Sequence, residues 1–214
     1  MHTLPKTLAG GPLATSPAKA MPDRLIRTAT QDDAERCLDV LTLAFELDLT
    51  CRWVWPNRRQ YLEAFPRFAR AFGGAAIDLG TAHYHEGFAG VALWLPPGAA
   101  PDEESLMRVI RETVSEDRVE AVFSMFEQMG GYHPTEAHWH LPLIGVAPGH
   151  QSRGIGSALL ADALELCDRQ QLPAYLEATS PRNVALYRRH GFGILGRIQV
   201  ADSPAVVPML RRPR

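Results

Sequence analysis

A glycine-rich segment, GVAPGHQSRGIGSALLA at residues 145–161, has the residue types of an anion-binding site at the start of an expected helix. Gly149, Gly154 and Gly156 carry no Cβ, so a ligand can approach the backbone closely there. The segment contains no Asp or Glu. Acidic residues are favoured at helix N-termini, where unpaired N–H groups carry partial positive charge. We therefore expect its amides to bind a phosphate group that is not part of the chain.

Two common nucleotide-binding motifs do not fit this segment. A Walker loop requires GxxxxGK[ST], and the segment contains no Lys. A dinucleotide fingerprint requires GxGxxG, and counting from Gly154 and Gly156 the third glycine position is occupied by Leu159. Arg153 and His150 add positive charge nearby. A glycine-rich loop that only turns the chain stays open as the simpler interpretation.

A second group of polar residues lies on two expected strands and could take part in proton transfer. Glu177 interrupts an apolar run and shares a strand face with Tyr175 and Thr179, and a carboxylate is costly to bury without a partner. His138 and His140 share a face of another strand, and imidazole titrates near neutral pH. We favour Glu177 as the group that orients or deprotonates a substrate, with His140 second. A purely structural polar role stays open for either residue.

The elements that must position these groups alternate between strands and helices. Strand patterns fall at residues 24–30, 76–86, 88–97, 138–146, 173–179, 192–200 and 205–211. Helical spacing of apolar residues falls at 34–45, 57–72, 102–129, 152–170 and 181–190. The strand–helix–strand order over 138–179 predicts a parallel βαβ unit, whereas the run 76–97 predicts an antiparallel hairpin. We predict one α/β domain with a mixed central sheet and helices on both faces.

Composition narrows the class of protein. The net charge of −2, from 22 Lys and Arg and 24 Asp and Glu, lacks the strong positive charge of nucleic-acid-binding proteins. No apolar run has the length of a membrane span, so we expect neither nucleic-acid nor membrane partners. Cys37, Cys51 and Cys167 are far apart, which favours free thiols in a reducing cytoplasm. Residues 1–20 are expected to be a disordered tail that precedes a domain at 21–214.

Two motifs carry a resemblance to a known family. Gln151, Gly154 and Gly156 match the signature [QR]xxGx[GA], and LEATSPRNVALYRRHGF at 176–192 follows downstream. In these stretches the chain resembles the GNAT superfamily of acyl-CoA-dependent N-acyltransferases, and in detail the subgroup that includes puromycin N-acetyltransferase. The resemblance is strong over 138–200 and weak over 50–80 and 100–137.

The resemblance implies acetyl-CoA as the co-substrate. Its pyrophosphate would lie on the amides around the signature loop, and the pantetheine arm would pair with the strand before it, where that strand splays from its neighbour. Pro142 fits such a splay because proline cannot donate to a ladder, although a simple strand break stays open. The cofactor-binding residues implied are Ile144, Gly145, Val146, Gln151, Ser152, Arg153, Gly154, Ile155, Gly156, Ser157, Asn183 and Tyr187.

The resemblance also implies a catalytic role for Tyr187, as the acid that protonates the departing thiolate. A half-buried core tyrosine is the alternative. We expect direct transfer of an acetyl group to the primary amine of a small, antibiotic-like or amino-acid-like molecule, since no cysteine lies near the motifs to form a covalent intermediate. An acyl-CoA-binding sensor of the same fold, without turnover, is the alternative function. We expect a monomer or homodimer.

Two HxH pairs, His83 with His85 and His138 with His140, have the spacing of metal ligands on a strand face. If the sheet follows the family order, a third strand separates them by about 10 Å. That is too far for one ion with ligand distances of about 2 Å, so we predict no metal site.

Aromatic residues cluster where the acceptor side would form. We interpret them as core, because aromatic residues at helical or alternating spacing usually pack inside a domain. A place in the substrate pocket stays open for two of them, Trp53 and Trp55. The full set is Trp53, Trp55, Tyr61, Phe65 and Trp94.

Overall fold

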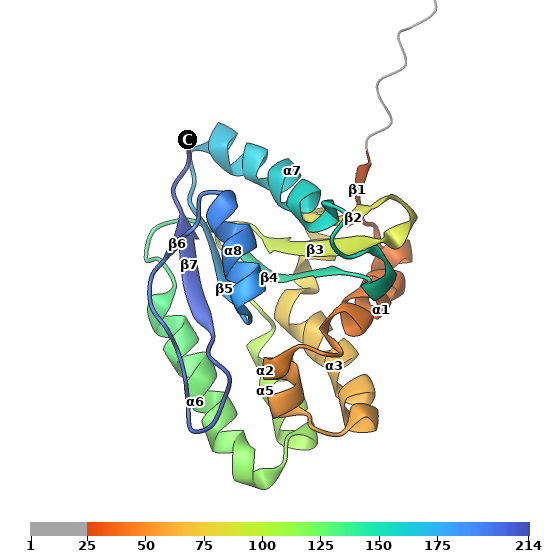
Figure 1. The fold of residues 1–214 in the computed structure, drawn as a ribbon, viewed down its shortest axis with the longest axis vertical. Helices are drawn as coiled ribbons and strands as arrows, with labels where there is room; N and C mark the ends of the chain where they lie inside the picture. Colours follow the sequence, from red (N-terminus) through yellow and green to blue (C-terminus); the bar gives the residue numbers. More distant parts are fainter. Residues whose placement is uncertain (1–24) are drawn as a thin grey trace, which may run out of the picture.

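A seven-stranded mixed sheet runs through residues 25–214, the part of the chain that the computed structural model describes (Figure 1). The strands lie in the order β1-β2-β3-β4-β5-β7-β6. The expected tail at 1–20 lies outside the described residues. The strand bounds are Ile26–Thr28 for β1, Ala82–His85 for β2, Gly90–Leu95 for β3, Trp139–Val146 for β4, Ala174–Ala178 for β5, Gly193–Ile194 for β6 and Val207–Arg211 for β7.

Strand pairing confirms the expected mixed sheet. The neighbours from β1 to β4 are antiparallel, β4 and β5 are parallel, and β7 is antiparallel to β5. The parallel pairing joins β4 to β5 only from Trp139 to Leu141, whereas β3 pairs with β4 as far as Val146. Pro142 follows directly after the last paired residue and has no N–H to donate. The second half of β4 therefore has no pairing partner on its β5 side.

Helices cover both faces of this sheet, as expected. One face carries α1, α2, α3, α5 and α6, which pack with β3 and β4 in one core cluster. The other face carries α7, which packs with β1 to β4, and α8, which packs with β5, in a second cluster (Figure 1). The bounds are Ala34–Phe45 for α1, Leu49–Val54 for α2, Arg58–Gly73 for α3, Ala75–Asp78 for α4, Glu103–Thr113 for α5, Glu116–Tyr132 for α6, Ile155–Gln170 for α7 and Pro181–Arg189 for α8.

Several boundaries differ from the sequence-based expectations. The helix expected at 152–170 begins at Ile155, because Ser152 and Gly154 have left-handed φ angles of 64° and 83° that an α-helix cannot contain. The strand expected at 76–86 begins with the short helix α4. The strand expected at 192–200 is reduced to two residues of β6. Within residues 25–214, no helix combines the length and apolar character needed to cross a membrane.

Candidate functional site

The N-terminus of α7 has no capping side chain from the chain itself. Gly154 is its N-cap residue, no side chain there makes a cap hydrogen bond, and the first turn contains no acidic residue. The Gln151 side chain instead turns back and donates from Nε2 to the carbonyl of Val146, 3.2 Å away. The loop is thereby tied to the end of β4. The first amides of α7 are left for an anion, because unpaired N–H groups and the helix dipole favour negative charge there.

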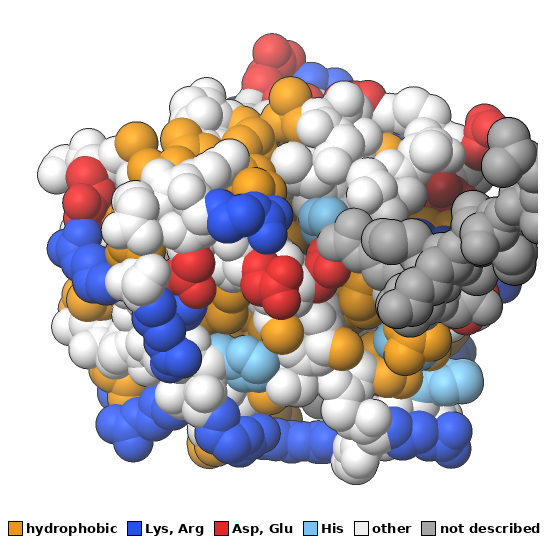
Figure 2. Space-filling view, turned by 90° about the horizontal axis from the view of Figure 1, so that it is seen from above, with side chains coloured by type: hydrophobic (Ala, Val, Ile, Leu, Met, Phe, Trp, Pro, Cys, Tyr) orange, Lys and Arg blue, Asp and Glu red, His pale blue; other side chains and the backbone are white. Residues whose placement is uncertain are grey.

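A groove runs past this helix start, and we call it the α7 groove. It is formed by the end of β4, the loop 150–154, the first turn of α7, α8 and residues 44–49. Arg182 and Arg189 of α8 are exposed, line the groove together with His150 and add positive charge. Arg side chains also form a row along one edge of the face in Figure 2. The groove therefore combines free amides with cationic side chains.

Eleven of the twelve residues expected to contact the cofactor line the α7 groove; Arg153 does not, and it is exposed. The eleven come from three short segments that the sheet and α8 bring together. They are Ile144, Gly145, Val146, Gln151, Ser152, Gly154, Ile155, Gly156, Ser157, Asn183 and Tyr187.

Gly145 sets the distance between β4 and α1 beside the groove. A Cβ at this position would lie 2.7 Å from the Cβ of Ala44 and 3.2 Å from Cδ2 of Leu41. A larger residue would therefore push α1 away from the strand. This close packing keeps the part of β4 that lacks a β5 partner along the floor of the groove.

Helix α8 presents two of the expected residues. Ser180 is its N-cap, and its Oγ accepts a hydrogen bond from the backbone N–H of Asn183, 3.2 Å away, with Pro181 in the first turn. Tyr187 lies one turn further on and is 5% exposed. Burial, with a smaller contribution from the charge of Asp48, raises the pKa of the Tyr187 phenol. The phenol is therefore protonated, in its donor form, at neutral pH.

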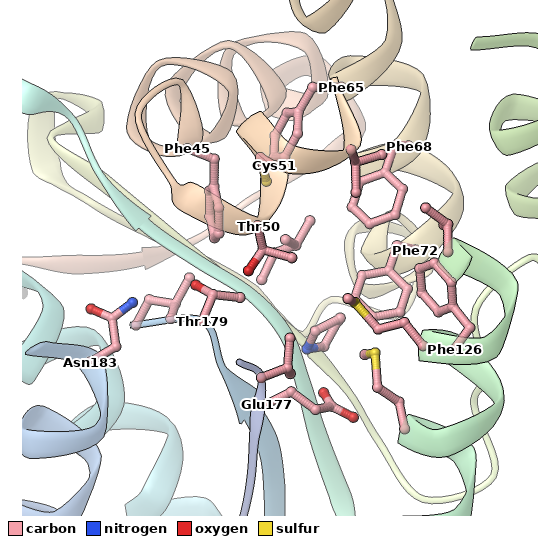
Figure 3. Close-up of a pocket in the computed structure, with 18 of the residues that line it drawn as sticks. Phe45, Thr50, Cys51, Phe65, Phe68, Phe72, Phe126, Glu177, Thr179 and Asn183 are labelled. Atoms are coloured by element: carbon pink, nitrogen blue, oxygen red, sulfur yellow. The ribbon is translucent and has the colours of Figure 1, made fainter. Parts of the chain in front are cut away.

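An apolar cavity of about 100 Å³ continues from the groove into the domain. Four residues line both the groove and the cavity: Phe45, Ile144, Asn183 and Tyr187. Asn183 and Tyr187 belong to α8, so the two spaces meet at this helix. Figure 3 shows Asn183 at one side of the cavity and a group of rings at the other, with Glu177 below. Besides Tyr187, six aromatic side chains line it: Phe45, Trp55, Phe65, Phe68, Phe72 and Phe126.

The structure places the aromatic residues as follows. Trp55 and Phe65 are buried core residues, as expected, and also line the apolar cavity. Trp53 does not line it; its Nε1 donates to Asp202 at 2.8 Å.

Cys51 corrects another expectation. Although no cysteine lies near the motifs in the sequence, the structure places Cys51 in the cavity wall. Burial raises the pKa of this thiol, which disfavours the nucleophilic thiolate.

Glu177 is the charged side chain of this cavity, and it is 4% exposed. Its Oε2 lies 3.2 Å from Nε2 of His140, and its Oε1 lies 3.4 Å from Nε2 of His133 and makes no hydrogen bond. Burial alone raises the pKa of Glu177, but interactions with the two imidazoles outweigh it and lower the pKa to about 2. The carboxylate is therefore ionised at neutral pH.

His133, at the end of α6, is a site residue that sequence reasoning missed. Its Nδ1 lies 3.4 Å from Nε2 of His138, whose Nδ1 is 2.8 Å from the Glu136 carbonyl and so donates to it. Burial lowers the pKa of His138, which favours the neutral ring. His133, His138 and His140 also line a second cavity on the far side of Glu177. The sequence shows an HPxxxHxH spacing that begins at His133, but only the fold shows that His133 lies next to the carboxylate of Glu177.

The two HxH pairs, which were not expected to share a metal ion, lie on or next to β2 and β4. β3 separates β2 from β4, and His83 lies 3.8 Å from Asp162, away from His140. One other group, His133 with His140 and Glu177, has zinc-like ligand types, with ligand atoms within 4.8 Å of one another.

Asp48 joins the two sides of the site, and sequence reasoning also missed it. Its Oδ1 accepts from the backbone N–H groups of Thr50 and Cys51 at the start of α2, at 3.0 and 3.1 Å. Its Oδ2 accepts from the Thr179 hydroxyl at the end of β5, at 2.6 Å. This bridge fixes α2 over the end of β5, between the α7 groove and the apolar cavity.

Comparison with known proteins identifies the fold. The model of the acetyltransferase (GNAT) family matches residues 94–192. A solved structure described as histone acetyltransferase HPA2 and related acetyltransferase from Corynebacterium glutamicum is 27% identical. It has a TM-score of 0.63, covering 88% of this chain and 96% of that chain. Arylalkylamine N-acetyltransferase 2 from Aedes aegypti is 12% identical, with a TM-score of 0.61, covering 88% of this chain and 98% of that one.

A curated relative, an uncharacterized N-acetyltransferase of Schizosaccharomyces pombe, is 26% identical over 164 residues. The match covers 68% of this chain and 63% of that relative, so the chain spans less than two thirds of the relative's length. With the family-model match and the solved structures, these similarities show that the chain has the fold of the GNAT acetyltransferases.

Proposed function

We propose that this chain, with its GNAT acetyltransferase fold, transfers an acetyl group from acetyl-CoA directly to the primary amine of a small molecule. One observation carries the proposal: the α7 groove and the apolar cavity meet at Tyr187 and Asn183. A co-substrate in the groove and an acceptor in the cavity would therefore have their reacting ends at the same side chains.

The groove suits coenzyme A in two respects. The free amides at the start of α7, with Arg182 and Arg189 beside them, suit a pyrophosphate. The residues of β4 after Pro142, which lack a β5 partner, offer backbone groups to the amide-bearing pantetheine arm. When bound, acetyl-CoA supplies an activated acetyl thioester.

The reaction forms a C–N bond and breaks a C–S bond. The amine nitrogen attacks the thioester carbon, the amine loses a proton, and the departing sulfur gains one. Tyr187 would donate the proton to the sulfur, because burial keeps its phenol protonated. A covalent route would need a thiolate at Cys51, and burial disfavours the thiolate by raising the pKa of this thiol.

Glu177 would orient the amine, and His140 would accept its proton. The Glu177 carboxylate faces the cavity and, with a pKa of about 2, would attract an ammonium group but hold a proton only in passing. The His140 imidazole lies 3.2 Å behind it and would take the proton. His133 and His138 continue from there to the second cavity, which offers the proton a way out. Glu177 thus becomes the orienting group and His140 the base.

The acceptor with a free primary amine is a prediction. It is supported by the likeness of the sequence motifs to those of the subgroup that includes puromycin N-acetyltransferase. The test is release of coenzyme A thiol from acetyl-CoA with a panel of primary amines. Amine-dependent thiol release supports the proposal. Tight binding of acetyl-CoA with no thiol release from any amine would instead favour an acyl-CoA-binding sensor.

A further inference from the structure

The lining of the apolar cavity restricts the chemistry of the acceptor. Aromatic rings from α1, α3 and α6 line it, together with Trp55, directly after α2, and with Met125 and Met129. Phe68 and Phe72 stack with centroids 5.3 Å apart, and Phe126 lies 6.4 and 5.9 Å from them. Such rings can enclose an aromatic or branched apolar group in offset or edge-to-face contact. A polyhydroxylated amine would lose its hydration against these walls without gaining hydrogen bonds.

The charge of the cavity restricts the acceptor further. Among the described residues that line it, Glu177 is the charged one, and no Lys or Arg lines it. Oε1 of Glu177 is buried and makes no hydrogen bond, with Nε2 of His133 3.4 Å away, so an ammonium group can approach it as a further partner. A carboxylate on the substrate would be desolvated with no cationic partner and would be repelled by Glu177.

We propose that the acceptor is a primary amine on an aromatic or bulky apolar skeleton with no carboxylate, the amine lying between Tyr187 and Glu177. Its apolar group would lie against the cavity side of the ring cluster formed by Phe68, Phe72 and Phe126. The inference rests on the proposed function and names the substrate class of the same site. It disfavours free amino acids, aminosugars and polyamines as acceptors.

Matched amines test the inference with the full-length protein. Phenethylamine and phenylalanine differ by one carboxylate, and glucosamine supplies a polar amine without a ring. We expect kcat/KM for phenethylamine to exceed that for phenylalanine by about a hundredfold or more, because like charges meet in a poorly hydrated cavity. Calorimetric binding of the two amines to the coenzyme A complex should show the same order, without depending on turnover.

Two variants on α6 test the place of the apolar group. Phe126→Ala should raise KM for phenethylamine about tenfold with little change in kcat, because it removes a ring of the cavity. Phe123→Ala is the matched control: Phe123 lies one turn earlier, lines the second cavity and not the apolar one, and should leave KM unchanged. Melting temperatures of both variants separate loss of folding from loss of binding.

The outcomes distinguish the inference from the proposed function. Faster turnover of phenylalanine or glucosamine than of phenethylamine would overturn the inference and leave the acetyltransferase intact. An equal KM increase in Phe123→Ala and Phe126→Ala would also overturn it. Thiol release from none of the amines would overturn the proposed function and this inference with it.

Discussion

An acidic residue in the first turn of α7 should abolish cofactor binding without unfolding the protein. Gly156→Asp is the best variant, because a Cβ at Gly156 meets neighbours only at 3.7 Å and the residue has an ordinary helical φ. Gly154→Asp would confuse the result, since its φ of 83° strains any residue with a side chain. The helix dipole should even stabilise the free variant by about 0.5 kcal/mol.

The magnitude of the binding loss follows from Coulomb's law. A carboxylate about 5 Å from one phosphate charge, at an effective dielectric constant of about 20, is repelled by about 3 kcal/mol. This corresponds to a roughly 200-fold weaker Kd for coenzyme A, and a second phosphate charge increases the loss. Higher salt should recover part of the affinity, because it screens exposed charges.

Calorimetric titration with coenzyme A, alongside a thermal melt of the free protein, measures both effects. Gly156→Asn is the matched control, with the same shape and no charge, and should retain most of the affinity. If Gly156→Asp binds coenzyme A as tightly as Gly156→Asn does, the phosphate site lies elsewhere. A large fall in melting temperature for the aspartate variant alone would refute the electrostatic explanation.

Three further predictions concern single residues. Tyr187→Phe should lower kcat about 100-fold or more with Kd for coenzyme A unchanged, and undiminished thiol release would remove its role as acid. Gly145→Ala should destabilise the fold by about 1–3 kcal/mol in urea unfolding, through its 2.7 Å approach to α1, and an unchanged midpoint would contradict that packing. Glu177 has a folded pKa of about 2, below its usual 4.5, so its ionised form stabilises the fold above pH 4.5 and that stability is lost as pH falls toward 2. For the unmodified protein this loss should be about 3 kcal/mol of unfolding free energy, measured by urea unfolding between pH 4.5 and 2, and the Glu177→Gln variant should lack it. If the unfolding free energies of the two proteins had the same pH dependence, the stabilisation of the Glu177 carboxylate by the two imidazoles would be contradicted.

The α7 groove was predictable because its residues are local in sequence. The segments 144–157 and 180–187 each contain their own strand end, loop and helix start, so motif and backbone chemistry predict their geometry directly. The absence of acid in the first turn of α7 and the Ser180 cap are visible in the sequence alone. The start of α7 was placed three residues early because apolar spacing does not reveal the left-handed Ser152 and Gly154.

The apolar cavity was not predictable in the same way. Its walls come from helices spread over residues 45–129, and amphipathic spacing shows which side chains are buried without showing which buried side chains leave a space between them. Cys51 lies in α2 and Asp48 is its N-cap, and this short helix has too few turns to give a clear pattern. His133 reaches Glu177 only because α6 ends beside β5.

The most direct test of the account is mass spectrometry of one reaction, with the amine and the intact protein both examined. Incubation with acetyl-CoA and phenethylamine should give N-acetylated amine and free coenzyme A in equal amounts, and the protein mass should not change when the amine is omitted. Acetylated protein without amine, with the label on Cys51, would contradict direct transfer. Thiol release that leaves the amine unmodified would contradict the transfer itself.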